Sequence, residues 1–406
     1  MRVFLSCLVC RIVTFVLHKL GRGATSMPGK VALKVKRNVL KDLSKNTKVI
    51  VVTGTNGKTT SCRILEEGLK KAGKSYFINK SGANLITGVT ASFIMNSTVT
   101  GKCKKDYAII ECDENAFKEV SRYIHCDVIL VTNVFRDQLD RYGEVTHTLN
   151  AIKESVKNLP NAIVCLDADC SLTYSMSKEI SNKIITFGVN VPFDKNAKAP
   201  EISDAKYCIF CKHEYDYTYH TYGHLGGFVC NNCGYKRPQP DFAVESVEEM
   251  KNDHSVVVAN LNGDKNIIKV NIGGAYNIYN AIGCAAALTA LGIEQKIIID
   301  AIENFNGAFG RMEHFKSGNN TVNLILVKNP AGFSQTMNFL KSIDDDFTLI
   351  LSLNDNAADG RDISWIWDVD FSGIFDKSNV KELYVTGKRC YDMAVRVKYE
   401  GVGNRE

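Results

Sequence analysis

Short apolar runs that alternate with amphipathic stretches make up most of the chain from residue 45 to residue 305. Runs rich in valine and isoleucine, at 49–52 and 127–134, are typical of strands buried on both faces of a parallel sheet. Amphipathic helical patterns follow them, and further strand patterns come at 75–78, 106–114, 161–169 and 183–189. The alternation predicts a central, mostly parallel, doubly wound α/β domain over residues 45–305.

The pattern changes after about residue 250. Apolar stretches at 255–261 and 267–272 flank Asn262 and Gly263, which predicts a β-hairpin. A long helix is expected from Gly273 to about Ala290. Strand patterns at 321–327, 347–353 and 382–387 predict a second, smaller α/β domain over residues 306–406.

The first 44 residues predict a helical arm. Residues 1–20 are apolar, but Arg11 interrupts the run and no small-residue cleavage site follows, which disfavours a signal peptide. The stretch is also too short and too interrupted to span a bilayer. We interpret it as an amphipathic or buried helix, and two placements stay open: packing on the first domain, or contact with a membrane surface. Residues 31–44 are basic and roughly helical.

Composition adds the class of protein. A chain of 406 residues is long enough for two or three domains, and 45% hydrophobic with 23% charged residues is typical of a soluble globular protein. The mild net charge of +6 fits anionic substrates or a membrane surface and does not indicate nucleic-acid binding. Most of the fourteen cysteines stand alone in apolar runs, as buried thiols do in a reducing compartment. We therefore expect a cytoplasmic protein, and the N-terminal arm leaves peripheral contact with the inner face of the membrane open.

A glycine-rich loop directly after the strand at 49–52 carries the candidate chemistry. Its backbone N–H groups and the helix that follows would point at a phosphate, and a lysine and a threonine come directly after the second glycine. Val52 stands where the general P-loop pattern has its first glycine, so this is a shorter form. The alternative is an ordinary βα turn. The predicted nucleotide-binding residues are Gly54, Thr55, Asn56, Gly57, Lys58, Thr59 and Thr60.

Two further groups are expected beside this loop. Glu111 ends the strand pattern at 106–114, and ligands of open α/β sheets bind at the carboxyl ends of strands. Glu111 is therefore predicted to hold Mg²⁺ with the Thr59 hydroxyl, and the alternative is a solvated strand-end acid. Asn277 and Asn280 share one helix face, and their carboxamides suit an adenine edge. The alternative for Asn277 is capping of the helix N-terminus.

Two Cys-x2-Cys pairs, separated by eighteen residues, are the most specific local pattern in the chain. Two such turns can close a tetrahedral Zn²⁺ site. Four thiolates leave no open coordination position, so the site is expected to be structural; redox dithiols or a disulfide clip are the alternatives. The tyrosines between the pairs are interpreted as packing within a small hairpin at 206–236, because no dense basic cluster favours nucleic acid. The predicted ligands are Cys208, Cys211, Cys230 and Cys233.

Taken together, these motifs resemble the Mur ligase family over about residues 45–400. Besides the loop at 54–60 and Glu111, the resemblance rests on Thr132-Asn133, Asp137-Gln138-Leu139-Asp140, Asn277-Ile278-Tyr279-Asn280-Ala281 and Gly310-Arg311-Met312-Glu313. It implies ATP and Mg²⁺ as cofactors and a carboxylate that is activated as an acyl phosphate before an amine attacks it. Lys58 and Arg311 would then offset charge on the transferred phosphoryl group.

Within that family the chain resembles the MurT-type ligases, which carry a four-cysteine insertion in the central domain. The C-terminal signatures are Lys328-Asn329-Pro330-Ala331-Gly332 and residues 354–362. The resemblance implies amidation of the D-glutamate α-carboxylate in the lipid II stem peptide, with ammonia released from glutamine by a partner of the GatD type. It also implies that Asp362 completes the Cys–His pair of that partner, in the logic of a triad split across two chains; the alternative is a loop-stabilising acid. The expected catalytic residues are thus Asp362, Lys58 and Glu111.

Two departures separate the chain from amino-acid-adding Mur ligases. Gln138 stands where many of those enzymes have histidine, and Ile152 falls where their carbamylated lysine lies, with Lys153 one position away. We therefore expect no carbamate, which counts against the alternative function, a Mur- or folylpolyglutamate-type ligase that adds an amino acid. MurT-type chains also continue beyond this sequence, so the last domain is expected to lack a closing element.

Overall fold

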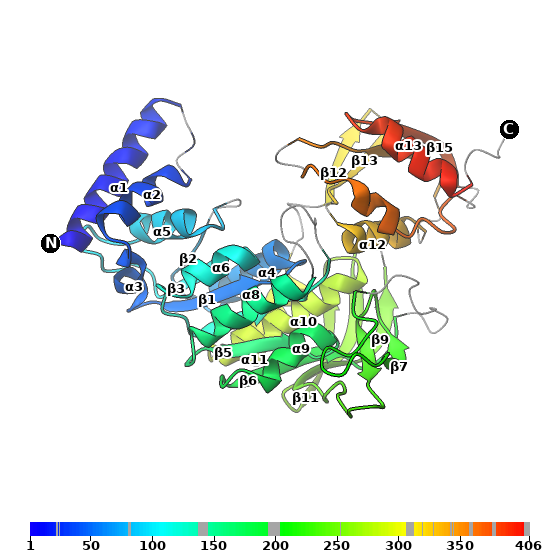
Figure 1. Ribbon diagram of the computed structural model, residues 1–406, viewed down its shortest axis with the longest axis horizontal. Helices are drawn as coiled ribbons and strands as arrows, with labels where there is room; N and C mark the ends of the chain where they lie inside the picture. The colour runs from blue at the N-terminus through cyan, green and yellow to red at the C-terminus, as the bar shows by residue number, and fades with distance from the viewer. Residues whose placement is uncertain are drawn as a thin grey trace.

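The computed structural model describes the chain except residues 22, 24, 80–82, 137–144, 194–203, 252, 306–311, 319, 328, 342, 344, 357–359, 376–378 and 402–406, and the side chains of 312–314 and 331. At its centre is a nine-stranded mixed sheet with the order β11-β10-β9-β6-β5-β4-β1-β3-β2 (Figure 1). The strands are β1 Lys48–Thr53, β2 Tyr76–Ile78, β3 Tyr107–Glu111, β4 Val128–Val131, β5 Ile163–Asp167, β6 Ile184–Val189, β9 Phe242–Met250, β10 Ser255–Leu261 and β11 Asp264–Val270.

The predicted doubly wound sheet is confirmed. β1 to β6 and β9 pair in parallel, whereas β10 is antiparallel to both of its neighbours. The strands nearest the centre are almost wholly buried, as continuous apolar runs covered on both faces should be. The predicted hairpin is also confirmed: Asn262 and Gly263 adopt φ of 54° and 109° between β10 and β11, the positive values that a type I′ turn requires.

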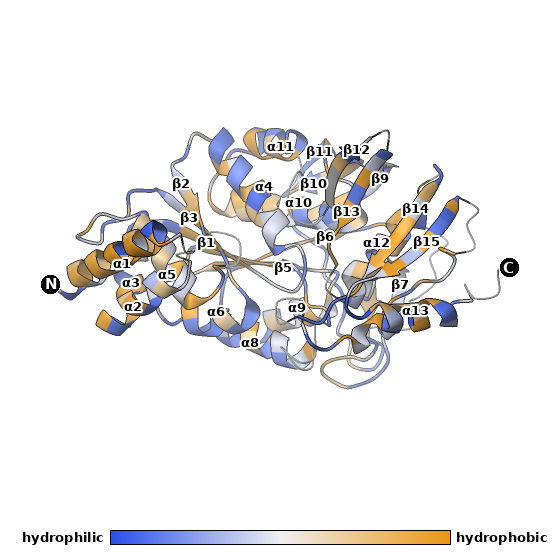
Figure 2. Cartoon of the chain, turned by 90° about the horizontal axis from the view of Figure 1, so that it is seen from above, coloured by the Kyte–Doolittle hydropathy of each residue, from blue (hydrophilic) through white to orange (hydrophobic). Residues whose placement is uncertain are grey.

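Helices cover both faces of the sheet (Figure 2). On one face α4, α10 and α11 pack against one another, and on the other α6 packs against α8. Their bounds, with those of the short α9 and η1, are α4 Lys58–Lys71, α6 Glu114–Val120, α8 Val145–Lys157, α9 Ser171–Ser175, η1 Met176–Lys178, α10 Ala275–Ala290 and α11 Gln295–Glu303.

Four helices form a separate layer beyond the β2 edge of the sheet: α1 Arg2–Lys19, α2 Met27–Val35, α3 Val39–Ser44 and α5 Ile86–Met95. α2 packs between α1 and α5. Gly29 permits this approach, because a Cβ there would lie 1.8 Å from the carbonyl oxygen of Thr87. The predicted first helix is thus confirmed and packs on the protein, while the predicted helix at 31–44 is divided into α2 and α3. Within the described part of the chain, no helix is long and apolar enough to cross a bilayer.

The C-terminal part has a hydrophobic core of its own, which includes Phe333, Trp365 and Phe371. β14 and β15 pair in parallel there, and α13 packs against both. β13 pairs antiparallel with β12 in a separate ribbon, so the predicted strand at 321–327 does not join β14 or β15 among the described residues. The bounds are β12 Met312–Ser317, β13 Asn320–Ile325, α12 Pro330–Lys341, β14 Phe347–Ser352, η2 Ser364–Asp368, β15 Val380–Thr386 and α13 Cys390–Tyr399.

Candidate functional site

The glycine-rich loop lies at the carboxyl end of β1, between β3 and β4. Here the strand order reverses, which is where open α/β sheets bind ligands. Gly54 and Gly57 adopt φ of 120° and 87°, a region that glycine enters without strain. Gly57 directly precedes α4, so the positive end of a fourteen-residue helix faces the loop.

The residues after β4 hold this loop in place. Asn56 N donates to Asn133 Oδ1 at 3.0 Å, and Asn133 Nδ2 donates back to the Asn56 carbonyl at 3.2 Å. The Thr55 hydroxyl donates to the Phe135 carbonyl at 3.1 Å and accepts from the Phe135 N–H. A Cβ at Gly54 would lie 2.4 Å from the Thr132 hydroxyl oxygen. The loop is therefore preorganised by contacts about 80 residues away in sequence.

Lys58 is nearly buried and is paired with Glu114. Its Nζ lies 2.7 Å from Glu114 Oε1, and the two side chains are 10% and 4% exposed. The ammonium also donates to the carbonyls of Gly54 and Thr55. Burial raises the pKa of Glu114, and the Lys58 charge opposes that rise. Sequence reasoning assigned no role to Glu114, although it lies only three residues after Glu111, at the first position of α6.

Thr59 and Glu111 meet beside the lysine. The Thr59 hydroxyl donates to Glu111 Oε1 at 3.1 Å. Asn79, which follows β2, fixes the backbone of Glu111: Asn79 Oδ1 accepts from the Glu111 N–H at 2.8 Å, and Asn79 Nδ2 donates to its carbonyl at 2.9 Å. A hydroxyl and a carboxylate next to a phosphate cradle are oxygen ligands of the kind that Mg²⁺ takes.

Asn277 and Asn280 lie behind the loop, in the first turns of α10. Asn280 Nδ2 donates to Asn277 Oδ1 at 3.0 Å, and Asn277 Nδ2 donates to the Gly273 carbonyl at 2.7 Å. A Cβ at Gly57 would lie 2.1 Å from Asn280 Oδ1. The residue at the N-cap of α10 is Gly274, with no side-chain cap bond, so Asn277 does not cap this helix. Their contact with adenine stays a prediction.

The C-terminal part reaches the loop directly. Asn329 Nδ2 donates to Asn56 Oδ1 at 3.0 Å, and Arg136 Nη1 lies 2.8 Å from Asp368 Oδ2. Asp362 lies just before η2, where its Oδ1 accepts from the Ser364 N–H at 2.8 Å. Arg311 and the stretch 137–140 lie outside the described residues.

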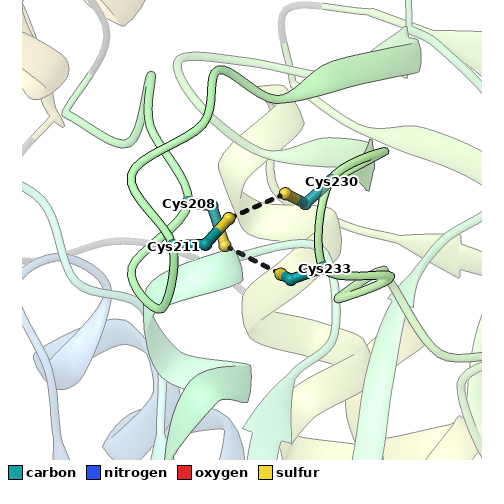
Figure 3. A group of neighbouring side chains, drawn as sticks. All are labelled: Cys208, Cys211, Cys230 and Cys233. Carbon is teal, nitrogen blue, oxygen red and sulfur yellow. Dashed lines mark hydrogen bonds between the residues drawn. The ribbon is translucent and has the colours of Figure 1, made fainter.

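The four predicted cysteines converge from two facing loops (Figure 3). The Sγ atoms of Cys208 and Cys233 are 3.6 Å apart, those of Cys211 and Cys230 are 3.4 Å apart, and all four lie within 4.8 Å of one another. Four thiolates at a Zn–S distance of about 2.3 Å would be about 3.8 Å apart in a tetrahedron, so the geometry fits a metal ion. All fourteen cysteines are free thiols, which rules out the disulfide clip in this structure.

The cysteine-bearing insertion is packed on the central domain. Its strands are β7 Asp216–His220 and β8 Gly226–Val229. The Tyr219 hydroxyl donates to the Val189 carbonyl at 2.7 Å, and Tyr217 and Tyr222 are likewise packed inward, which confirms the packing interpretation for these tyrosines. His224 is 1% exposed, and its Nε2 lies 3.3 Å from Cys170 Sγ. Burial lowers the pKa of His224 to about 4.

Two stretches match known families: residues 52–233 match the Mur ligase middle domain, and residues 326–406 match the MurT ligase C-terminal domain. The chain is 36% identical over 401 residues to the lipid II isoglutaminyl synthase (glutamine-hydrolyzing) subunit MurT of Streptococcus pneumoniae, covering 99% of this chain and 88% of that protein. The chain belongs to the MurT family of Mur ligases.

The fold of this MurT-family chain is shared with more distant ligases. A pseudomurein peptide ligase type C from Methanothermus fervidus aligns with a TM-score of 0.63 at 20% identity, over 87% of this chain and 79% of that one. A MurF ligase from Thermotoga maritima in complex with ADP aligns with a TM-score of 0.58 at 12% identity, over 91% and 83% of the two chains. The predicted Mur ligase-like fold and family are therefore confirmed.

Proposed function

We propose that this chain is the ATP-dependent ligase subunit that amidates the D-glutamate α-carboxylate of the lipid II stem peptide, giving D-isoglutamine for peptidoglycan synthesis. The observation that carries the proposal is the phosphate loop, in which Lys58 and the Thr59–Glu111 pair stand together at the strand-order reversal. The similarity of the chain to a MurT subunit, over nearly its whole length, supplies the substrate class.

In the proposed reaction, the loop amides and the α4 N-terminus bind the triphosphate of ATP. Thr59 and Glu111 are the residues that would hold Mg²⁺, which offsets phosphate charge when bound. A carboxylate oxygen attacks the γ-phosphorus, and ADP leaves. Lys58 then stabilises charge on the transferred phosphoryl group, for which it must turn from Glu114 towards the nucleotide. Asn277, Asn280 and Arg311 are assigned to the nucleotide as well.

Ammonia completes the reaction. Its nitrogen attacks the acyl carbon of the acyl phosphate. The bond between that carbon and the bridging oxygen breaks, inorganic phosphate leaves with this oxygen, and a proton is lost to give the amide. We assign the ammonia supply to a glutaminase partner of the GatD type, whose Cys–His pair Asp362 would orient. A small uncharged nucleophile needs no amino-acid pocket. Lys153, the lysine nearest the family's carbamate position, lies 2.9 Å from Glu179 in an ion pair, which does not favour the amino-acid-adding alternative.

The remaining assignments follow from the same proposal. Cys208, Cys211, Cys230 and Cys233 hold a structural zinc ion, because four thiolates leave no position open for catalysis. The enzyme would act at the inner face of the cell membrane, where its lipid-linked substrate is anchored.

Lys58→Ala tests the proposal. The purified variant should lose ATP-dependent amidation with free ammonium chloride as nitrogen donor, while its melting curve reports an intact fold. Lys70→Ala, on the exposed face of the same helix, is the matched control and should keep full turnover. Amidation by the Lys58 variant at the normal rate, or turnover that requires a free amino acid in place of ammonium, would contradict the proposal.

A further inference from the structure

The first helix carries its large apolar side chains on the outside. Ile12, Phe15 and Leu20 are 52%, 62% and 64% exposed. The other exposed apolar residues of this face recur at spacings of three or four: Met1, Phe4, Leu5, Leu8 and Val16. Such spacing makes one continuous stripe along a helix. A long apolar stripe of this kind is not left open to water without a reason.

The opposite face of α1 carries smaller and more polar side chains, which pack against the rest of the protein. Ser6, Cys7, Cys10 and Thr14 are buried there. The Ser6 hydroxyl donates to the Ala32 carbonyl of α2 at 3.2 Å, and the Arg11 guanidinium donates to the carbonyls of Ile94 and Ser97 at the end of α5. These bonds fix the rotation of α1, so the apolar stripe is held outward.

The same segment is strongly basic. Residues 1–47 contain ten lysines and arginines and one acid, Asp42, which gives a formal charge of +9, whereas the whole chain carries +6. The rest of the protein is therefore mildly acidic. The ammonium of Lys19 lies 5.4 Å from the centre of the Phe15 ring, so positive charge stands directly beside the stripe.

We infer that the outer face of α1 docks on the surface of an anionic lipid bilayer. Apolar side chains would enter the boundary between headgroups and acyl chains, and the surrounding cations would pair with lipid headgroups. The helix would lie on the membrane and not cross it, in keeping with the lack of a spanning helix in the described part of the chain. A second copy of the chain is a poorer occupant, because symmetric pairing would bring two segments of +9 together.

The position of α1 in the molecule fits this role. α1 lies at one end of the long axis, beyond the β2 edge, and the C-terminal α13 lies towards the other end in both views (Figures 1 and 2). Docking through α1 would leave the phosphate loop and the C-terminal face free. This inference deepens the proposed function. It rests on that function only to explain why the protein would bind a membrane, because its substrate is anchored there. The docking face itself is argued from the residues of α1.

Sedimentation with vesicles tests the inference, using the full chain and vesicles of phosphatidylglycerol and phosphatidylcholine or of phosphatidylcholine alone. The vesicles contain no lipid II and no nucleotide, so the result is independent of the proposed amidation. The full chain should bind the anionic vesicles and release them at high salt. Ile12→Ser with Phe15→Ser should weaken binding by about tenfold or more, and so should Arg2→Glu with Lys19→Glu.

Matched controls come from the opposite edge of the sheet. Ile267→Ser changes a side chain that is 70% exposed on β11, and Lys265→Glu with Lys296→Glu reverses two exposed charges on β11 and α11. Both controls should bind like the unaltered chain, and melting curves should match throughout. The inference is overturned if the full chain ignores anionic vesicles, if the α1 variants bind as well as the controls, or if α1 instead holds a dimer that the Ile12/Phe15 variant splits.

Discussion

Replacing Glu114 with glutamine should lower the stability of the nucleotide-free protein and raise its affinity for nucleotide. In the structure the Glu114 carboxylate lies 2.7 Å from the Lys58 ammonium, with both side chains nearly buried. The substitution removes the negative charge but keeps the shape of the side chain. The ammonium then remains buried without the carboxylate charge beside it, while the carbonyls of Gly54 and Thr55 still accept from it.

The expected cost follows from that geometry. Breaking one side of a buried ion pair destabilises a protein by about 3–5 kcal/mol. We expect the lower end, about 3 kcal/mol, because two carbonyls still accept from the lysine. For a domain of this size, that corresponds to a fall in melting temperature of roughly 5–10 °C. A bound triphosphate supplies the missing negative charge, so the penalty is relieved in the complex, and the affinity for MgATP should rise by up to about a hundredfold.

Thermal melts with and without MgATP, together with titration calorimetry, measure both quantities. Glu119→Gln is the matched control, because Glu119 is an exposed acid on the same helix; it should leave both unchanged. The reasoning is refuted if Glu114→Gln melts like the control, or if it binds MgATP more weakly than the unaltered chain. The second result would mean that Glu114 and Lys58 stay paired around the nucleotide.

Three further predictions concern other parts of the molecule. Burial lowers the pKa of His224 to about 4 in the folded chain, against about 6.5 in the unfolded chain. As the pH falls below 6.5, only the unfolded chain therefore takes up a proton. Between pH 7.5 and 5.5 this uptake should lower the free energy of unfolding by about 1.3 kcal/mol. Denaturant titrations should find that loss in the unaltered chain and not in His224→Gln. If the stability of both proteins depends on pH in the same way, His224 is not the cause. Cys208→Ser should abolish binding of about one zinc equivalent and expose the insertion to protease; unchanged zinc in elemental analysis would point to other ligands. Asp362→Asn should remove turnover driven by glutamine but spare turnover with ammonium, and equal loss of both would assign Asp362 to loop structure, where it already accepts from Ser364 N.

The parts of the fold and of the site that were predictable from sequence are local in sequence. The phosphate loop combines two glycines at positive φ with a helix start, all within a few residues. The cysteine pairs carry their spacing with them, and Asn262-Gly263 sets its own turn. In each case a short stretch of sequence determines both the side-chain chemistry and the local backbone geometry.

The contacts that were missed are long in range. Glu114 reaches Lys58 across 56 residues, Asn133 holds Asn56 across 77, and Asn329 reaches the same Asn56 across 273. No periodicity or spacing encodes such pairs, since they depend on which strands become neighbours. α5 went unrecognised because it is apolar on nearly every side, and β9 because only its first residues are fully buried.

The central claim is that ATP activates a carboxylate at the phosphate loop before nitrogen attacks. The most direct measurement follows ¹⁸O from a labelled D-glutamate α-carboxylate in a lipid II substrate during turnover with ammonium and MgATP. An acyl phosphate requires one labelled oxygen to leave with the inorganic phosphate and one to stay in the amide. We predict phosphate that carries one ¹⁸O for each amide formed; amide formation with unlabelled phosphate would contradict the account.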